Sequence, residues 1–126
     1  MSTLARNKKA FFDYEHLEEI EAGLVLKGYE VKSIKQGHMS LKGSFVAAHD
    51  NELFLTNAAI PLYKHATVSD YDSRASRKLL VKRKQINRLI EKVHADGLTL
   101  VPLSVYNNHG KIKLKFALAR GKRKFD

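Results

Sequence analysis

The chain has 126 residues and a mass of 14.3 kDa, which suits one domain with a single modest core. A hydrophobic share of 44% excludes wholesale disorder, and the absence of cysteine excludes disulfide scaffolds, thiol nucleophiles and Cys-based zinc sites. With 23 Lys and Arg against 13 Asp and Glu, the formal net charge of +10 indicates a polyanionic partner: RNA, DNA or an anionic membrane surface.

The first half of the chain is predicted to consist mainly of strands. Apolar residues alternate with polar ones there, a period of two that is typical of strands with one buried face. We expect residues 1–6 to be flexible. A strand containing the alternating Phe12, Tyr14 and His16 is predicted next, and an apolar run follows at 22–26. A helix is predicted at 28–35. After it, strands 41–49 and 52–60 are predicted to form a hairpin around a turn at Asp50 and Asn51.

The second half begins with a polar stretch, residues 69–76, which shows no period and is predicted to be a mobile loop. Residues 79–81 are expected to be extended. Gly97 suits the left-handed cap of a helix predicted to precede it. That helix spans 82–95, where apolar residues recur at helical spacing: Ile86, Leu89, Ile90 and Val93.

The chain ends in two predicted strands, 98–106 and 111–116, joined by a turn. Because Pro102 cannot donate a ladder hydrogen bond, the first strand is expected to be bulged there. About six strands and two or three helices predict a mainly β fold, a small antiparallel barrel with helices packed on it, as one domain over 1–126. Alternation in the last strand points Ile112, Leu114 and Phe116 inward and Lys111, Lys113 and Lys115 outward.

The excess positive charge lies entirely in the second half of the chain. Residues 1–63 hold 7 basic and 8 acidic residues, whereas residues 64–126 hold 16 basic and 5 acidic residues. Clustered like charges repel unless a partner neutralises them, which favours a phosphate-binding surface over a merely solvated face. The two clusters are Arg74, Arg77, Lys78, Lys82, Arg83, Lys84, Arg88 and Lys92, and then Lys111, Lys113, Lys115, Arg120, Lys122, Arg123 and Lys124.

No motif indicates an enzyme, a metal site or a cofactor. The histidines are scattered, and the sequence contains neither a phosphate-binding glycine loop nor a nucleophile motif. No stretch has the apolar core of a secretory signal or the ~20 apolar residues of a membrane span. We therefore expect a cytoplasmic protein without catalytic activity or membrane attachment. A solvated strand explains the one acidic cluster better than metal binding does: Glu15, Glu18, Glu19 and Glu21.

Seven short segments, taken in order, resemble the signature blocks of small protein B (SmpB), the SsrA-binding protein of bacteria. The resemblance covers residues 7–126, and the blocks are specific in combination. They are NKKA at 7–10, DY at 13–14, EAGLVLKG at 21–28, EVKS at 30–33, RKLL at 77–80, GLTLVPL at 97–103 and ALARGK at 117–122.

The resemblance implies an oligonucleotide-binding-fold barrel flanked by helices. It implies that the chain binds the tRNA-like domain of transfer-messenger RNA (tmRNA) and serves in trans-translation, the rescue of stalled ribosomes. The ribosome is an implied partner, and elongation factor Tu and alanyl-tRNA synthetase are implied indirect ones. The protein is expected to act as a monomer without bond chemistry or a cofactor.

The resemblance also assigns RNA-binding residues. The family's RNA-contacting glutamate falls on Glu30, a leucine of its basic helix on Leu89, and the lysine after its Ala-Arg-Gly on Lys122. Spacing alone interprets Leu89 as a core residue and Glu30 as solvent-facing, so for Leu89 the two interpretations differ. With their basic neighbours, the candidate RNA-binding residues are Glu30, Leu89, Lys122, Arg123, Lys124, Arg83, Lys84 and Arg88.

The sequence departs from the family pattern in two places. The family continues with a basic tail, whereas this chain stops at Asp126, so we expect it to bind RNA but not to support peptide tagging. Residues 64–76 lack the usual Asp-Pro and carry Tyr71-Asp72-Ser73 instead. This difference is expected to change the conformation of the loop and not the function.

Two other hypotheses stay open. The first is a general ribosomal or single-strand nucleic-acid-binding barrel protein. Against a base-stacking platform of that kind, tryptophan is absent, and Tyr106 and Phe116 lie in core-like patterns. The second is a nuclease that uses Glu18, Glu19 and Glu21, for which dependence on a divalent metal is the discriminating observation.

Overall fold

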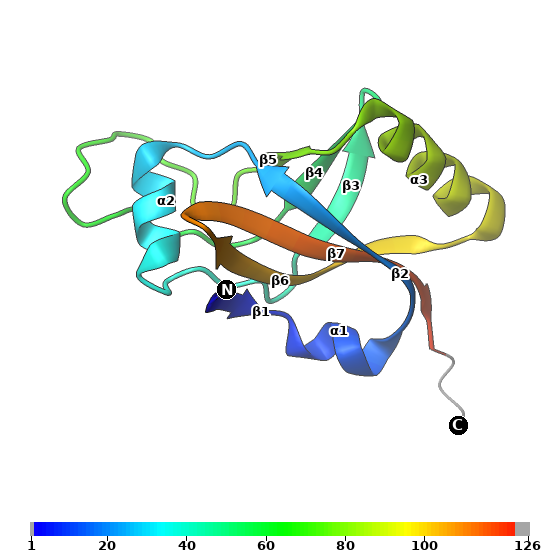
Figure 1. Ribbon diagram of the computed structural model, residues 1–126. Coiled ribbons are helices and arrows are strands. Elements are labelled where there is room, and N and C mark those ends of the chain that lie inside the picture. Colours follow the sequence, from blue (N-terminus) through cyan, green and yellow to red (C-terminus); the bar gives the residue numbers. More distant parts are fainter. Residues whose placement is uncertain (1, 123–126) are drawn as a thin grey trace.

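The computed structural model describes residues 2–122 (Figure 1). No helix in this part of the chain is long and apolar enough to cross a membrane. The elements are β1 (Ser2–Arg6), α1 (Lys8–Asp13), β2 (Tyr14–Leu24), α2 (Gly28–Lys35), β3 (Phe45–His49), β4 (Glu52–Thr56), β5 (Arg77–Leu80), α3 (Arg83–Asp96), β6 (Thr99–Asn108) and β7 (Lys111–Gly121).

The strands form one antiparallel sheet that closes into a ring. Within residues 2–122, seven strands are hydrogen-bonded in the order β1-β6-β3-β4-β5-β2-β7, and a further β6–β7 pairing closes the ring. In Figure 1, α2 and α3 lie toward opposite ends of the sheet and α1 lies below it. The predicted mainly β, antiparallel fold is confirmed, with seven strands in place of about six and with three helices in the described chain.

The core fills the inside of the ring. Strands and helices contribute to one main cluster, in which Ile34 of α2 and Ile86 of α3 pack with the inward residues of the sheet. In a second, smaller cluster, Ala10 of α1 is buried against Val101 of β6 and Ala117 of β7. The predicted alternation of β7 is confirmed, because its inward residues are buried and the lysines between them are not: Ile112, Leu114 and Phe116 against Lys111, Lys113 and Lys115.

The N-terminal region differs from the sequence prediction. Residues 1–6 were expected to be flexible, but Ser2–Arg6 form β1 and pair with β6 from Ser104 to Asn107. The predicted strand around Phe12 is wrong, since Phe12 lies in α1 and the strand begins at Tyr14. A six-residue helix is too short to show a helical period, and a strand whose partner lies about a hundred residues away leaves no local signal.

Several local predictions are confirmed by backbone geometry. Asp50 and Asn51, between β3 and β4, both have positive φ, as a two-residue hairpin turn requires. The structure places α2 at the predicted residues and ends α3 at Gly97, which has the left-handed φ of 63°. The ladder between β6 and β7 shifts register after Pro102, where the bulge was expected.

The connection from β4 to β5 is the long loop of the molecule. Residues 57–76 contain no helix or strand, and an isolated β-bridge pairs Ala59 of this loop with Ser40. This is the stretch in which 69–76 was predicted to be a mobile loop. The loop is confirmed, and its mobility stays a prediction.

Candidate nucleic-acid interface

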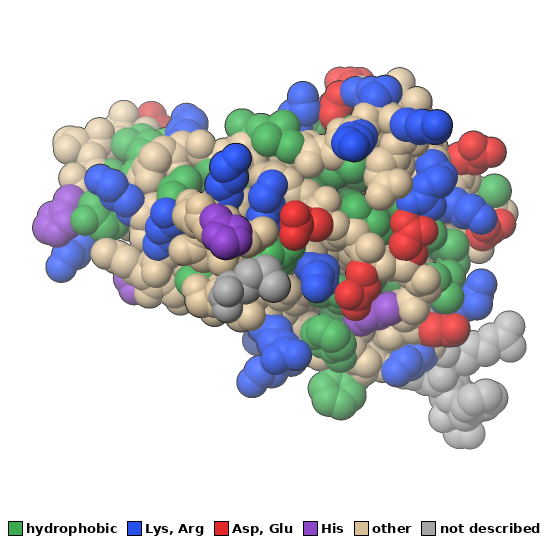
Figure 2. Space-filling model, viewed as in Figure 1, with side chains coloured by type: hydrophobic (Ala, Val, Ile, Leu, Met, Phe, Trp, Pro, Cys, Tyr) green, Lys and Arg blue, Asp and Glu red, His purple; other side chains and the backbone are tan. Residues whose placement is uncertain are grey.

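Basic side chains gather around the first turns of α3. Lys82, Arg83 and Lys84 stand at its start, and Arg88 follows in its second turn. The side chain of the N-cap residue, Lys82, makes no capping hydrogen bond and the first turn contains no acidic residue, so backbone N–H groups at this end add to the positive charge. Figure 2 shows Lys and Arg side chains over this helix with Asp and Glu side chains between them. This end of α3 is therefore suited to bind phosphate.

A groove of about 810 Å³ lies beside the start of α3. Lys82, Lys84 and Arg88 line it together with one acid, Glu21 of β2. The exposed side chain of Leu80 gives it an apolar wall. Three cations beside an apolar wall fit a sugar–phosphate backbone better than a small apolar ligand. The structure thus brings two of the candidate residues, Lys84 and Arg88, into one concave surface.

Two candidate arginines have acidic partners within the fold. Arg83 pairs with Glu52 of β4. Arg88 Nη1 donates to Glu18 Oε1 of β2 at 3.0 Å. All four side chains are partly exposed, and pairs of this kind contribute only ~0–1 kcal/mol, so an RNA phosphate can take the place of the carboxylate at small cost. In the described part of the chain, no acidic side chain forms an ion pair with Lys84.

The structure does not bring Glu30 and Lys122 together. Lys122 directly follows β7 and is exposed, as predicted, and its backbone N–H donates to the carbonyl of Asp13 at 2.9 Å. Glu30 lies on α2, beyond the other end of the β2–β7 ladder. That ladder runs from Tyr14 to Gly23, which at ~3.3 Å per residue separates its ends by roughly 30 Å. Arg123 and Lys124 lie outside the described residues.

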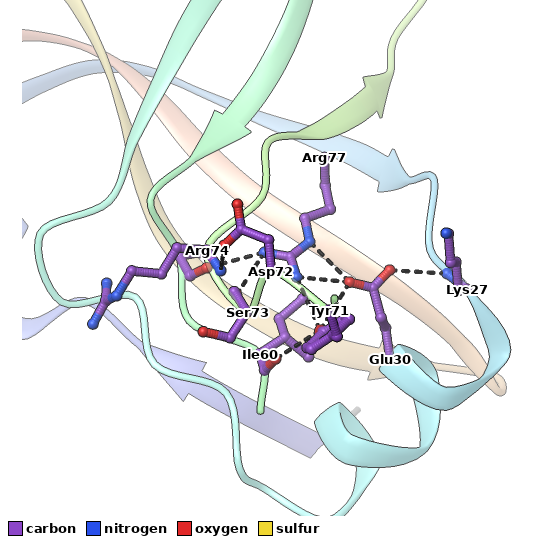
Figure 3. A network of polar contacts seen from close by, with 9 residues as sticks. Lys27, Glu30, Ile60, Tyr71, Asp72, Ser73, Arg74 and Arg77 are labelled. Atoms are coloured by element: carbon purple, nitrogen blue, oxygen red, sulfur yellow. Dashed lines mark hydrogen bonds and ion pairs between the residues drawn. The ribbon is translucent and has the colours of Figure 1, made fainter. Parts of the chain in front are cut away.

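Glu30 is buried, which contradicts its predicted solvent exposure. Only 6% of its surface is exposed, and its carboxylate forms an ion pair with Arg77 of β5, itself 4% exposed. Arg77 Nε and Nη2 lie 3.0 and 2.6 Å from Glu30 Oε2, and the backbone N–H of Lys27 donates to Oε1 at 3.0 Å (Figure 3). The hydroxyl of Tyr71 lies 3.1 Å from Oε2. With both oxygens engaged, this carboxylate has no accessible face for RNA.

The contacts of this network shift the pKa of Glu30 and the pKa of Tyr71 in opposite directions. Burial by itself raises the pKa of Glu30, but the Lys27 N–H and the Arg77 guanidinium outweigh it and hold that pKa below its ordinary value. Burial and the neighbouring Glu30 carboxylate raise the pKa of Tyr71 to about 12. At neutral pH the network therefore contains a carboxylate, a guanidinium and a neutral phenol.

Leu89 belongs to the core. Its side chain is 0% exposed and lies in the main cluster with Ile86 and Phe116. An RNA contact by this side chain would require α3 to leave the sheet. The interpretation from helical spacing is confirmed, and the contact carried over from the family resemblance finds no support in the geometry.

The acidic cluster does not converge on a metal site. Glu18 pairs with Arg88, and Glu19 Oε1 lies 3.9 Å from Lys115 Nζ. Glu21 accepts a hydrogen bond from the hydroxyl of Tyr106. Within residues 2–122, no group of three or more acidic, histidine or cysteine side chains could hold a metal ion. Each of these glutamates has a separate partner, which removes the geometric basis of the nuclease hypothesis.

Aromatic side chains are exposed around α1, which sequence reasoning missed. Phe12 is 77% exposed, and Phe11 beside it is 41% exposed. A second groove, of about 670 Å³, lies next to α1 and includes Lys8, Lys9 and the partly exposed Phe45. Tyr106 and Phe116, the aromatic residues weighed against base stacking, are indeed buried, whereas these residues are exposed.

Arg77 and Tyr71 form a buried network with Glu30 that the sequence did not predict. Arg77 looks like one more cation of the basic cluster, yet it lies two residues before the buried Leu79 in a strand and so shares its inward face. That period of two is the one available signal. Tyr71 lies in a segment without a period, and its partners come from α2 and β5. No local pattern reveals such contacts.

The chain is similar to known proteins in sequence and in structure. The family model described as SmpB protein matches residues 4–126. A protein of Neorickettsia sennetsu named SsrA-binding protein is 50% identical over 127 residues, covering 100% of this chain and 86% of that protein. A protein of the same name from Mycolicibacterium paratuberculosis is 45% identical, covering 98% of this chain and 73% of that protein.

A solved structure is also similar. It is described as "tmRNA-SmpB: a journey to the center of the bacterial ribosome", and its chain matches with a TM-score of 0.75 at 44% identity. The match covers 96% of this chain and 85% of the other. Sequence and structure therefore lead to the same family across nearly the whole chain.

Proposed function

The chain belongs to the SmpB protein family, and we propose that it acts as an SsrA-binding protein. In this role it binds tmRNA through the tRNA-like domain and takes part in trans-translation, the rescue of stalled ribosomes. The observation that carries the proposal is the combination of that membership with the cationic groove beside α3, lined by Lys82, Lys84 and Arg88. The chemistry of this groove is that of phosphate binding.

Within this function, the candidate residues take different roles. We propose Lys84, Lys122, Arg83 and Arg88 as phosphate contacts, the two arginines by exchanging their carboxylate partners for RNA phosphates. When a phosphate replaces the carboxylate beside an arginine, counterions are released from the RNA, and the carboxylate left behind is partly exposed to water and not buried. Leu89 supports the helix that presents these cations and does not contact RNA.

The wider partners follow from the function. The ribosome is the second partner, and elongation factor Tu and alanyl-tRNA synthetase act on the RNA that this protein binds. We place the protein in the cytoplasm as a monomer that performs no bond chemistry. Its contribution is to hold a structured RNA in a defined shape.

A competition experiment tests the proposal. Labelled tRNA-like domain of tmRNA is bound to the protein at physiological salt, and unlabelled tmRNA or total tRNA is added. We expect tmRNA to displace the label at far lower concentration, and Lys84→Ala to weaken binding. The matched control is Lys111→Ala, an exposed lysine at the start of β7 and outside both grooves. Equal displacement by both RNAs would contradict the proposal.

The exposed aromatic residues favour one alternative, a single-strand nucleic-acid-binding protein. Phe11, Phe12 and the groove beside α1 offer a stacking surface next to Lys8 and Lys9. In the same competition, an unstructured oligonucleotide that displaces the label as well as tmRNA does would support this alternative.

A further inference from the structure

The buried Glu30–Arg77 pair closes the base of the long loop between β4 and β5. Arg77 Nη1 donates to the carbonyls of Ala58 and Ser73, at 3.0 Å each. These carbonyls lie at opposite ends of the loop, and the backbone N–H of Ile60 also donates to Ser73 at 2.9 Å. The guanidinium thus ties the outgoing and the returning segments together. Residues 61–70 project beyond this closure and are called the projecting loop below.

Tyr71 adds a second tie at the same place. Its hydroxyl lies 2.7 Å from the carbonyl of Ile60 and 3.1 Å from Glu30 Oε2, and it accepts a hydrogen bond from Arg77 Nη2 at 3.1 Å (Figure 3). The single phenolic proton can be donated to either acceptor. The Tyr29 ring of α2 meets the Tyr71 ring edge-on at 5.6 Å. The closure therefore depends on α2, on β5 and on the loop itself.

The projecting loop carries cationic and aromatic side chains. Lys64 and His65 are exposed, and the half-buried Tyr63 ring packs edge-on against His65 at 5.3 Å. Lys32 of α2 places its Nζ 5.4 Å from the centre of the Tyr63 ring. Figure 2 shows Lys, Arg and His side chains gathered at this end of the molecule. Among the described residues, no acidic side chain forms an ion pair with Lys32 or Lys64.

We propose that Glu30 is a positioning residue for RNA binding. It holds the projecting loop in place through Arg77 and Tyr71. The loop residues Tyr63, Lys64 and His65, together with Lys32 of α2, then form a second RNA contact surface. This inference rests on the proposed function. The surface lies on α2 and the projecting loop, whereas the phosphate-binding groove lies beside α3. Lysine and histidine suit phosphates, and the tyrosine ring suits a base or a ribose face.

The physical reason for the positioning role is that the Arg77 guanidinium cannot keep its buried position without the Glu30 carboxylate. A buried guanidinium whose charge loses its partner reorganises toward water, and in doing so it releases Ala58 and Ser73. An untied loop samples more conformations, and the entropic cost of ordering it exceeds what its contacts with RNA return, so the loop of the variant no longer engages RNA. Loss of Glu30 therefore weakens RNA binding although its carboxylate never touches RNA.

A double-mutant cycle separates positioning from direct contact. The affinity for the tRNA-like domain RNA is measured for wild type, Glu30→Gln, Lys64→Ala and the double variant, with Lys84→Ala as the reference for the other surface. We expect each of Glu30→Gln and Lys64→Ala to weaken binding several-fold and the double variant to be no weaker than Glu30→Gln alone. The affinity losses caused by Glu30→Gln and by Lys84→Ala should multiply when the two are combined, because they affect separate surfaces.

Three outcomes would overturn the inference in distinguishable ways. If the effects of Glu30→Gln and Lys64→Ala multiply, Glu30 acts independently of the loop. If neither weakens binding while Lys84→Ala does, the loop is not an RNA surface. If the wild type does not bind this RNA, the proposed function fails and the inference with it.

A fluorescence reporter follows the loop itself and guards against a folding defect. The chain contains no tryptophan, so Val68→Trp places a single indole, which can be excited apart from the tyrosines, in the projecting loop. Below the unfolding transition, Glu30→Gln in this background should lower the fluorescence anisotropy, and Lys64→Ala should not. If Glu30→Gln does not fold, Tyr71→Phe takes its place in both experiments with the same expected signs. Unchanged anisotropy in the variant used would refute the positioning role.

Discussion

Replacing Leu89 by asparagine tests whether this residue packs or binds. Its side chain is 0% exposed in the main core cluster. Removing a buried leucine costs about 2–5 kcal/mol, and an amide left without a partner adds roughly 1–3 kcal/mol. We therefore expect Leu89→Asn to lose about 3–8 kcal/mol of unfolding free energy, a large share of the ~5–15 kcal/mol of a typical domain. That is at least the ~3–5 kcal/mol expected for Phe116→Ala, a second fully buried residue.

The assay combines unfolding with RNA titration. Thermal and urea unfolding are followed for wild type, Leu89→Asn and the exposed control Glu91→Asn, which lies two residues further along α3. The control should stay within ~0.5 kcal/mol of wild type, whereas Leu89→Asn should melt at least roughly 10 °C lower. RNA affinity is then measured at a temperature where both variants are folded. A variant that melts within ~2 °C of wild type and binds RNA poorly would show that Leu89 is a contact residue and that the core argument is wrong.

The remaining predictions concern charge and backbone. Glu30→Gln should cost about 3–5 kcal/mol at pH 7, because the Arg77 guanidinium loses its charged partner and can reach water only by giving up its buried hydrogen bonds. Since folding lowers the pKa of Glu30 from its ordinary value of 4.5, the wild type should lose stability as the pH falls below about 5 toward the folded pKa. In urea unfolding from pH 3 to 7, the unfolding free energy of Glu30→Gln should accordingly depend less on pH than that of the wild type. RNA affinity should fall linearly with the logarithm of salt concentration, and Lys84→Ala should reduce that slope by about one in a binding titration; an unchanged slope would exclude Lys84 as a phosphate contact. Gly97→Ala should cost about 1–2 kcal/mol in unfolding experiments without changing RNA affinity, because the residue has a φ of 63°.

Local patterns predicted the elements whose signal lies within a few residues. The positive-φ turn at Asp50 and Asn51, the helix ending at Gly97 and the alternation of β7 are each set by neighbours in sequence. The same holds for Leu89, since the helical period alone placed it in the core. By contrast, β1 and α1 are short, and their stabilising partners on β6 and β7 lie about a hundred residues away.

The sequence by itself determined the class of the fold, the family and the basic character of the second half of the chain. Only the tertiary structure decided which charged residues can reach a partner. Glu30 and Arg77 lie 47 positions apart, yet the fold brings α2 against β5 and buries both charges. Arg83 and Arg88 are partly neutralised by acids on β4 and β2, whereas Lys84 lines an open groove. The physical reason is that burial and pairing of a charge depend on long-range contacts, which composition and spacing do not contain.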